Sequence, residues 1–252
     1  MKRIVLVTGA TSGFGKAIAL RFAREGDHLI ITGRRKDRLE ALAAELGKEF
    51  KTEVLALCFD VRSREEVEKN IGALSGKWKK IDILVNNAGL AVGLNPIQEG
   101  VYDDWERMID TNVKGLLYMT RVVAPLMIEN GSGHIINIGS VAGKEVYPNG
   151  NVYCGSKYAV DAITRGTRMD LLPYGIKVTQ VAPGAAETEF SLVRFKGNQE
   201  KAGQVYKGYK PLRAEDVADA VYYVTTLPEH ANINDLIITP TAQASAVHFH
   251  KK

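Results

Sequence analysis

The sequence predicts one α/β domain in which a seven-stranded parallel sheet carries helices on both faces, a doubly wound arrangement. Short apolar runs rich in β-branched residues alternate along the chain with amphipathic stretches. The short runs are continuously apolar, as expected for strands that are covered on both faces. No linker, internal repeat or low-complexity segment interrupts the 252 residues. We therefore expect residues 1–252 to form a single domain.

The first half of the chain contains three strand–helix pairs, with strands expected at 3–7, 28–33 and 53–61 and helices at 15–26, 36–47 and 63–74. The first two helices stop at Gly26 and Gly47, which are typical C-terminal signals. Ser63 and Glu66 form an S-x-x-E capping box at the start of the third helix. Each of these signals therefore lies at the beginning or the end of a predicted helix.

The second half continues the alternation, with strands expected at 81–87, 134–140, 176–184 and 235–240 and helices at 103–129, 151–172 and 214–226. Residues 185–212 fit neither pattern because they are polar and contain several glycines. Long irregular segments inside compact domains are often lids or binding loops. We expect this segment to be a substrate lid within the single domain.

Composition and charge exclude several classes of protein. The 33 basic and 29 acidic residues nearly cancel to a net charge of +4, and no dense Lys/Arg block is present, which argues against nucleic-acid binding. The apolar run after Lys2 and Arg3 is too short for a signal peptide. No apolar run approaches the roughly 18 residues needed to span a bilayer, so we expect a cytoplasmic protein without a membrane partner.

The two cysteines, Cys58 and Cys154, form no CxxC and no metal-ligand spacing. We therefore expect no metal site. A disulfide between them stays open, although a chain of this length needs none. The histidines of the final "VHFHKK" could bind a metal, but a frayed basic tail is the simpler interpretation. We expect the other histidines, His28, His134 and His230, to be structural.

A glycine-rich turn, "LVTGATSGFG", joins the first strand to the first helix. Gly9, Gly13 and Gly15 permit a tight turn and let backbone N–H groups reach a pyrophosphate at the positive end of a helix. Thr11 and Ser12 add hydroxyl donors, and Phe14 lies between the last two glycines. The spacing differs from the common G-x-G-x-x-G, and glycine turns of this kind also occur without a ligand. The position between strand and helix favours a Rossmann-type dinucleotide site.

The second strand ends in "TGRRKD", where NAD-binding folds usually place an acid for the ribose 2′-hydroxyl. Arg34 and Arg35 stand there instead. A guanidinium matches a phosphate monoester in charge and geometry, so we favour NADP over NAD. The alternative is that the two arginines belong to a basic, solvent-exposed start of the next helix, and the nearby Lys36 and Arg38 are consistent with this alternative.

Polar or glycine residues follow the third and fourth strands as well. Asp60 and Val61 end the third strand, where an adenine would lie, and Asn87, Ala88 and Gly89 follow the fourth. Ligands in open parallel sheets bind outside the carboxyl ends of the strands. These residues are therefore expected to line the cofactor site.

Tyr153 and Lys157 stand at positions i and i+4 and face the same side of the expected helix. Ser140 ends the fifth strand, and Asn112 lies inside the long helix, where asparagine is a poor helix former. Together with the glycine turn, Asp60, "NNAG" and the "PG" at 183–184, this set resembles the short-chain dehydrogenase/reductase family. The resemblance covers nearly the whole chain.

The resemblance implies a mechanism for these residues. Tyr153 would be the acid/base, and Lys157 with the positive nicotinamide would lower its pKa. Ser140 would hold the substrate oxygen, and Asn112 would hold a water that links Lys157 to solvent. Pro183, Gly184 and Thr188 would contact the nicotinamide end, with Tyr153 and Lys157 also touching the cofactor. The family also implies a homotetramer built through the long helices and the last strand.

Local stretches such as "GNVYCGSK", "VRFKG" and "LPEHANINDLIITPTAQ" resemble the NADP-dependent 3-hydroxy acid dehydrogenases, a group that includes serine and allo-threonine dehydrogenases. That group implies a small 3-hydroxy or 3-oxo acid as substrate. Arg194 is a candidate partner for its carboxylate, with Lys196 second, and Tyr147 and Asn151 would shape the pocket with Ser140 and Tyr153. "PGAAETEF" departs from the glycine-richer form of the group, which leaves the loop shape open. The alternatives are another short-chain carbonyl reductase, such as a 3-oxoacyl reductase, and a non-catalytic NADP-binding regulator.

Overall fold

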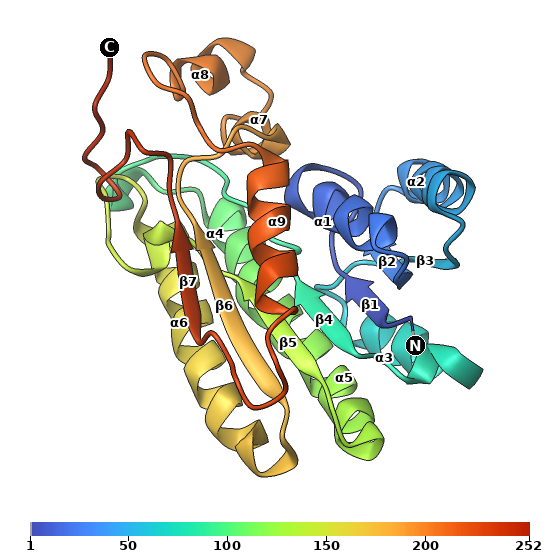
Figure 1. The fold of residues 1–252 in the computed structure, drawn as a ribbon. Helices are drawn as coiled ribbons and strands as arrows, with labels where there is room; N and C mark the ends of the chain where they lie inside the picture. The colour runs from blue at the N-terminus through green and yellow to red at the C-terminus, as the bar shows by residue number, and fades with distance from the viewer. Residues whose placement is uncertain (1) are drawn as a thin grey trace.

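The computed structural model describes residues 2–252 and contains a seven-stranded sheet in the order β3-β2-β1-β4-β5-β6-β7 (Figure 1). Every adjacent pair of strands is parallel, so the predicted fold class is confirmed. The strands are β1 Ile4–Val7, β2 His28–Gly33, β3 Val54–Cys58, β4 Ile83–Asn86, β5 His134–Ile138, β6 Lys177–Pro183 and β7 Asp235–Ile238.

Helices cover both faces of the sheet (Figure 1). One face carries α1 Gly13–Arg24, α2 Lys36–Phe50 and α9 Ala214–Val224, and the other carries α3 Arg64–Gly72, α4 Tyr102–Ile109, α5 Leu116–Asn130 and α6 Asn151–Leu171. Successive strand residues point to opposite faces, so Val5 and Val7 join the first core while Ile4 and Leu6 join the second. Both faces of β1 are therefore buried, which explains its unbroken apolar sequence.

The helix predicted over 103–129 is built differently. α4 and α5 are joined by a π-helical segment at Asp110–Gly115, which contains the buried Asn112. The Asn112 amide oxygen accepts from the Leu90 N–H at 2.8 Å, and its nitrogen donates to the Leu90 carbonyl at 2.8 Å. Widened turns of this kind recur at functional sites. The sequence signal was only the poor helix propensity of asparagine.

The strand order reverses between β1 and β4. The connection after β1 leads to β2 on one side, whereas the connection after β4 leads to β5 on the other side. Such a switch point opens a crevice at the carboxyl edge of the sheet. The Asn87 side chain, just after β4, crosses it and donates to the Thr8 carbonyl at 2.8 Å. The turns that follow β1 and β4 are thereby held together where the ligand of such a fold binds.

Residues 185–212 form a compact excursion that contains α7 Glu189–Arg194 and α8 Gln199–Gln204. Its two ends are joined, because the Glu187 N–H donates to the Leu212 carbonyl at 2.8 Å and the Leu212 N–H donates to Ala185 at 3.0 Å. Figure 1 shows α7 and α8 at one end of the molecule, close to the C-terminus. The remaining short elements are 3-10 turns at Gly76–Lys79, Ile97–Glu99, Val141–Gly143 and Leu172–Tyr174.

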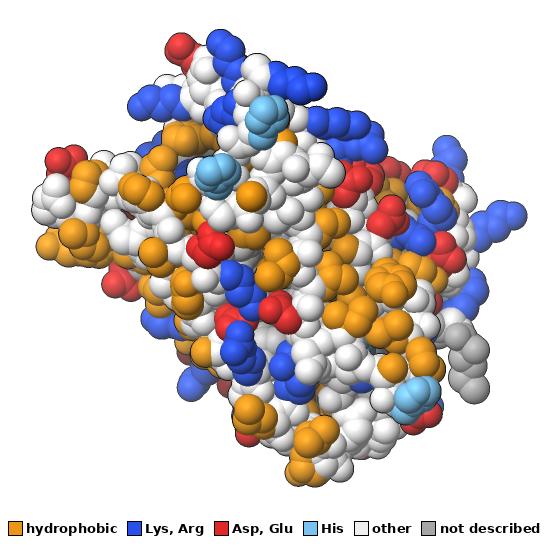
Figure 2. Space-filling view, turned by 60° about the vertical axis from the view of Figure 1, so that its left-hand side comes forward, with side chains coloured by type: hydrophobic (Ala, Val, Ile, Leu, Met, Phe, Trp, Pro, Cys, Tyr) orange, Lys and Arg blue, Asp and Glu red, His pale blue; other side chains and the backbone are white. Residues whose placement is uncertain are grey.

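The C-terminal tail is not frayed, contrary to the sequence-based expectation. Gln243 and Phe249 form an antiparallel bridge, and the Lys252 N–H donates to the Gly208 carbonyl at 2.8 Å. The Phe249 ring lies 5.1 Å from the ring of Tyr209. Figure 2 shows Lys and Arg side chains gathered at this end of the molecule. The tail is ordered by contacts with a distant part of the chain, which local composition does not reveal.

Across residues 2–252, no helix combines the length and the apolar character that a bilayer crossing requires. The same residues contain no group of three or more His, Cys, Asp or Glu side chains placed to hold a metal ion. Cys58 is exposed and Cys154 is buried, and both are free thiols. The disulfide left open by the sequence is therefore not formed.

Candidate functional site

A cavity of about 650 Å³ runs along the carboxyl edge of the sheet and beneath the 185–212 segment. This volume lies in the range of cofactor and small-molecule sites. Most site residues predicted from the sequence line it, namely Gly9, Thr11, Ser12, Gly13, Phe14, Arg34, Arg35, Asp60, Val61, Asn87, Ala88, Gly89, Ser140, Tyr147, Tyr153, Lys157, Pro183, Gly184, Thr188 and Arg194. Gly15, Asn112 and Asn151 are outside its lining.

The turn between β1 and α1 has a shape that only glycine permits. Gly9 and Gly13 have φ angles of +68° and +52°, in the left-handed region. A Cβ on Gly15 would lie 2.3 Å from the Gly9 carbonyl oxygen, so Gly15 is needed for the close approach of helix and strand. Within the described chain, Ser12 at the N-cap makes no capping hydrogen bond. The first N–H groups of α1 thus have no side-chain cap, an arrangement that fits a pyrophosphate.

Two arginines stand at the mouth of this end of the cavity. Arg35 donates from Nη2 to the hydroxyls of Thr11 and Ser12 at 2.9 and 2.7 Å. The Arg34 Nη1 lies 3.7 Å from the Asp60 carboxylate. Both arginine side chains remain about half exposed. Their position at the end of β2 fits a phosphate monoester attached to a ribose.

Glu189 in the first turn of α7 also contacts this mouth. Its Oε2 lies 3.0 Å from the Arg35 Nη1, and its Oε1 lies 3.0 Å from the Arg38 Nη1. Burial alone would raise the pKa of the Glu189 carboxyl, but hydrogen bonds from Arg35 and Arg38 hold that pKa below its ordinary value. The carboxylate is therefore ionised and connects α7 to the start of α2.

Asp60 is oriented by a neighbour that the sequence analysis did not single out. The Arg62 side chain donates to the Asp60 Oδ2 at 2.6 and 2.9 Å, and the Arg62 N–H donates to its Oδ1 at 3.0 Å. Burial opposes ionisation, but these hydrogen bonds lower the pKa of Asp60 below its ordinary value. The carboxylate is thus fixed at the rim beside Val61.

Tyr153 and Lys157 extend from the first turns of α6, and both side chains are buried. The Lys157 ammonium donates to the Ile138 carbonyl at 2.8 Å. Desolvation lowers the pKa of Lys157 to about 8, because burial penalises the charged form. The Tyr153 ring lies 5.7 Å from the ring of Phe190 in α7. Two helices far apart in sequence therefore meet at the tyrosine.

The pKa of Tyr153 is raised in the ligand-free chain. Burial raises this pKa above its ordinary value, while the Ser140 hydroxyl and the Arg194 charge act in the opposite direction. In the ligand-free chain desolvation outweighs the neighbouring charges. The lowering of the Tyr153 pKa expected from Lys157 together with the positive nicotinamide stays a prediction. Tyr153 is a protonated phenol at neutral pH in this structure.

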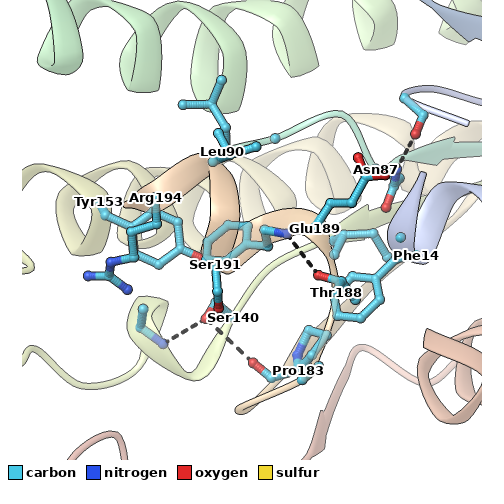
Figure 3. Close-up of a pocket in the computed structure, with 18 of the residues that line it drawn as sticks. Phe14, Asn87, Leu90, Ser140, Tyr153, Pro183, Thr188, Glu189, Ser191 and Arg194 are labelled. Carbon is cyan, nitrogen blue, oxygen red and sulfur yellow. Dashed lines mark hydrogen bonds between the residues drawn. The ribbon is translucent and has the colours of Figure 1, made fainter. Parts of the chain in front are cut away.

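Ser140 lies just after β5 and faces the same end of the cavity. Its hydroxyl donates to the Pro183 carbonyl at 3.4 Å and accepts from the Ala142 N–H at 3.1 Å. Figure 3 shows this hydroxyl between Tyr153 and Pro183, with Phe14 and Asn87 at the opposite end of the view. The long bond to Pro183 is weak by geometry, so the hydroxyl can be redirected to a bound oxygen.

Asn112 lies behind the cavity. Besides its two bonds to Leu90, its amide nitrogen donates to the Ser156 hydroxyl at 3.0 Å. A Cβ on Gly89 would lie 3.2 Å from the Asn112 Oδ1 and 3.7 Å from the Lys157 Nζ. Gly89 thereby keeps open the space between Asn112 and Lys157. The water-holding role expected for Asn112 stays a prediction.

Arg194, at the end of α7, reaches the substrate end of the cavity. Its Nη2 donates to the Tyr147 hydroxyl at 2.9 Å, and its guanidinium lies 5.3 Å from the Tyr147 ring and 5.7 Å from the Tyr153 ring. Figure 3 shows Arg194 beside Tyr153. Within residues 2–252 the Arg194 Nε is buried and has no hydrogen-bond partner. An unpartnered buried donor is costly unless a ligand accepts from it.

Asn151 lies beside the main cavity and not in its lining. It lines a small neighbouring cavity together with Arg194 and Tyr153, while its own amide donates to the Asn95 carbonyl at 3.1 Å. The Asn151 Oδ1 accepts from the adjacent Val152 N–H at 2.7 Å. The side chain is therefore committed to the start of α6 and is not part of the main cavity.

Several lining residues carried no usable sequence signal. The C-terminal tail contributes Gln243, Phe249 and Lys251 to the cavity. The Gln243 Oε1 accepts from the Ala185 N–H at 2.8 Å, which fixes the tail against the loop after β6. Among these residues only Glu189 had a weak sequence signal for a position at the site. It directly follows Thr188 in the segment that the sequence predicts to cover the site.

Comparison with known proteins agrees with this geometry. The family model of the short chain dehydrogenases matches residues 3–199. The chain is 50% identical to the NADP-dependent 3-hydroxy acid dehydrogenase YdfG of Salmonella typhi, over 96% of this chain and 97% of that protein. It is 46% identical to the serine 3-dehydrogenase of Agrobacterium fabrum, over 98% and 97% of the two chains.

A solved structure is similar over its whole length. The closed form of a serine dehydrogenase complexed with NADP⁺ superposes with a TM-score of 0.92 at 47% identity, and the match covers 99% of this chain and 100% of that one. The similarity therefore includes the 185–212 segment and the C-terminal tail as well as the sheet.

Proposed function

The chain belongs to the short-chain dehydrogenase family, and from that premise we propose an NADP-dependent oxidoreductase that interconverts the 3-hydroxyl group of a small 3-hydroxy acid with a carbonyl group. One observation carries the proposal. A single cavity has Arg34 and Arg35 at one end and Tyr153 beside Arg194 at the other. A cofactor with an extra phosphate fits the first end, and an alcohol with a carboxylate fits the second. The names of the two similar enzymes support both choices.

The residues present fit the cofactor. The glycine turn after β1 would hold the pyrophosphate, Arg34 and Arg35 the 2′-phosphate, and Asp60 with Val61 the adenine edge. Gly184 and Thr188 would lie at the nicotinamide end, with Pro183, Asn87, Ala88 and Gly89 along the wall. When bound, the nicotinamide supplies the hydride acceptor or donor.

Tyr153 exchanges the proton at the substrate oxygen. Its buried phenol is protonated in the ligand-free chain, the form needed to donate to a carbonyl oxygen. Ser140 holds the same oxygen once its hydroxyl turns from Pro183. Lys157, fixed on the Ile138 carbonyl, supplies a positive charge that favours the phenolate when the reaction runs as an oxidation. Asn112 holds a water in the space beside Gly89. This water links Lys157 to solvent and so returns the proton.

Arg194 binds the substrate carboxylate. Its Nε has no partner within the described residues, and its Nη2 already bonds to Tyr147. A carboxylate oxygen that accepts from Nε would satisfy the orphaned donor. Because Arg194 lies beside Tyr153, a substrate carboxylate bound to Arg194 would place the 3-hydroxyl group of the same substrate next to the Tyr153 phenol. Residues 185–212 act as the lid that brings Arg194 over this substrate.

The assembly is proposed to be a cytoplasmic homotetramer. Figure 2 shows hydrophobic side chains spread among charged ones over the face around α6 and β7. Exposed apolar residues stand on α5, α6 and β7, at Leu117, Tyr158, Met169 and Ile237. β7 is also an edge strand, which can pair with another chain. Light scattering after size-exclusion chromatography measures the mass, and a monomer would reject the tetramer.

The test of the function is a spectrophotometric panel. The purified protein is mixed with NADP⁺ or NAD⁺ and serine, allo-threonine, 3-hydroxypropionate or a 3-hydroxyacyl thioester, and reduced nicotinamide is followed by absorbance. We expect turnover with NADP⁺ and at least one of these acids. Turnover only with 3-hydroxyacyl thioesters would indicate a 3-oxoacyl reductase. Tight NADP binding without turnover of any alcohol would indicate a regulator.

A further inference from the structure

The carboxylate of Glu189 occupies guanidinium groups that an anionic ligand would use. It lies 3.0 Å from both the Arg35 Nη1 and the Arg38 Nη1. Arg35 lines the cavity, and so does Glu189. The ion pair therefore spans the opening between α2 and the lid.

A carboxylate and a phosphate monoester bind a guanidinium in the same way, through parallel N–H···O bonds. Arg35 has already committed its Nε and Nη2 to Thr11 and Ser12. The Nη1 held by Glu189 is therefore the side of Arg35 that remains for a phosphate. Two anions on the same nitrogen would also repel each other.

We propose that Glu189 competes with the cofactor's 2′-phosphate for Arg35 and so weakens NADP binding relative to NAD binding. The inference rests on the proposed use of NADP. The 2′-phosphate displaces Glu189 from Arg35, and Arg38 holds the displaced carboxylate away from the phosphate. NAD carries no phosphate at this position and leaves the Glu189–Arg35 pair in place. Glu189 is thus a residue that sets cofactor preference.

The placement of Glu189 connects this exchange to the reaction end of the cavity. The preceding residue, Thr188, caps α7 and lies 3.5 Å from the position of a Cβ on Gly13. The following residue, Phe190, packs against the Tyr153 ring at 5.7 Å. One turn of chain therefore touches the glycine turn, the arginine mouth and the acid/base tyrosine.

The test compares Glu189→Gln with Glu187→Gln. Each variant removes one negative charge from an exposed position, and the two positions are two residues apart. Unlike Glu189, Glu187 has no ion pair among those found in the described chain. Dissociation constants for NADP⁺ and NAD⁺ are measured by titration calorimetry, and thermal unfolding checks that each variant is folded. We expect Glu189→Gln to lower the Kd of NADP⁺ roughly two- to fivefold, the range for an exposed ion pair, and to leave the Kd of NAD⁺ unchanged.

The outcomes separate the inference from the proposed function. Unchanged or weaker NADP⁺ binding in Glu189→Gln overturns the competition, as does equal tightening for both cofactors or an equal effect of Glu187→Gln. A wild-type protein that binds NAD⁺ as tightly as NADP⁺ overturns the proposed cofactor instead. Wild-type preference for NADP⁺ with no effect of Glu189→Gln rejects only the inference.

Discussion

The Arg194 guanidinium donates to the Tyr147 hydroxyl at 2.9 Å while lying 5.7 Å from the Tyr153 ring, so a fixed cation and a buried phenol share one end of the cavity. Arg194→Ala should raise the KM for 3-hydroxy acids roughly ten- to a hundredfold, the usual cost of a lost charged hydrogen bond. The kcat should change much less. Steady-state kinetics measure both constants.

Two controls accompany this variant. Lys201→Ala removes an exposed cation from α8 and should leave the KM unchanged. A secondary alcohol without a carboxylate should be oxidised equally by wild type and Arg194→Ala. An equal loss with that alcohol would show that Arg194 only supports the local structure of α7.

Tyr153→Phe keeps the ring beside Phe190 and removes only the phenol oxygen. Turnover should fall by about 10²- to 10⁴-fold, the range for a general acid/base, while the Kd of NADP⁺ stays the same. Tyr158→Phe is the matched control, because Tyr158 lies on the same helix with its hydroxyl bonded to the Lys144 carbonyl. Retained turnover in Tyr153→Phe would reject the acid/base role.

The same substitution should have opposite effects at two glycines. Gly15→Ala would place a Cβ 2.3 Å from the Gly9 carbonyl oxygen and should destabilise the fold by about 2 kcal/mol. Gly72→Ala, in the exposed last turn of α3 with no atom from another part of the chain within 4 Å of the new Cβ, should stabilise it by about 0.5 kcal/mol. Urea unfolding measures both changes. Equal stability of the two variants would contradict the close approach of α1 to β1.

His134 should make the fold sensitive to acid. Burial lowers its pKa to about 3, whereas the unfolded side chain titrates near 6.5, so the unfolded state binds the extra proton between these values. Stability is therefore lost as the pH falls from 6.5 toward 3, by about 2 kcal/mol at pH 5. His134→Gln should remove this loss, and the exposed His230→Gln should not. Urea unfolding at pH 7 and pH 5 provides the comparison.

The parts of the fold that depend on local pattern were predictable. Each continuously apolar run became a strand, and Gly9, Gly13 and Gly15 lie where a tight turn needs them. The i and i+4 spacing brought Tyr153 and Lys157 to the same side of α6. These features depend on a few neighbouring residues, so the sequence displays them directly.

The parts that depend on distant contacts were not predictable. In the π-helical segment Asn112 bonds to Leu90, and in the tail Phe249 packs on Tyr209, so both depend on residues far apart in the sequence. The direction of the Tyr153 pKa shift depends on burial beneath α7, which no local spacing encodes. The hydrogen bond from Asn151 to the Asn95 carbonyl could not be predicted for the same reason, since Asn95 lies far away in the sequence.

The hydrogen bonds that join residues 185 and 187 to Leu212 also bear on how substrate range can change. The chain leaves and re-enters the sheet scaffold at nearly the same point, as in a compact surface loop. The stretch between these ends can therefore be exchanged or altered in length without moving β6 or α9. Specificity for a new hydroxy acid could be transplanted as a cassette, provided that Thr188 and Glu189 at its start are kept for the cofactor.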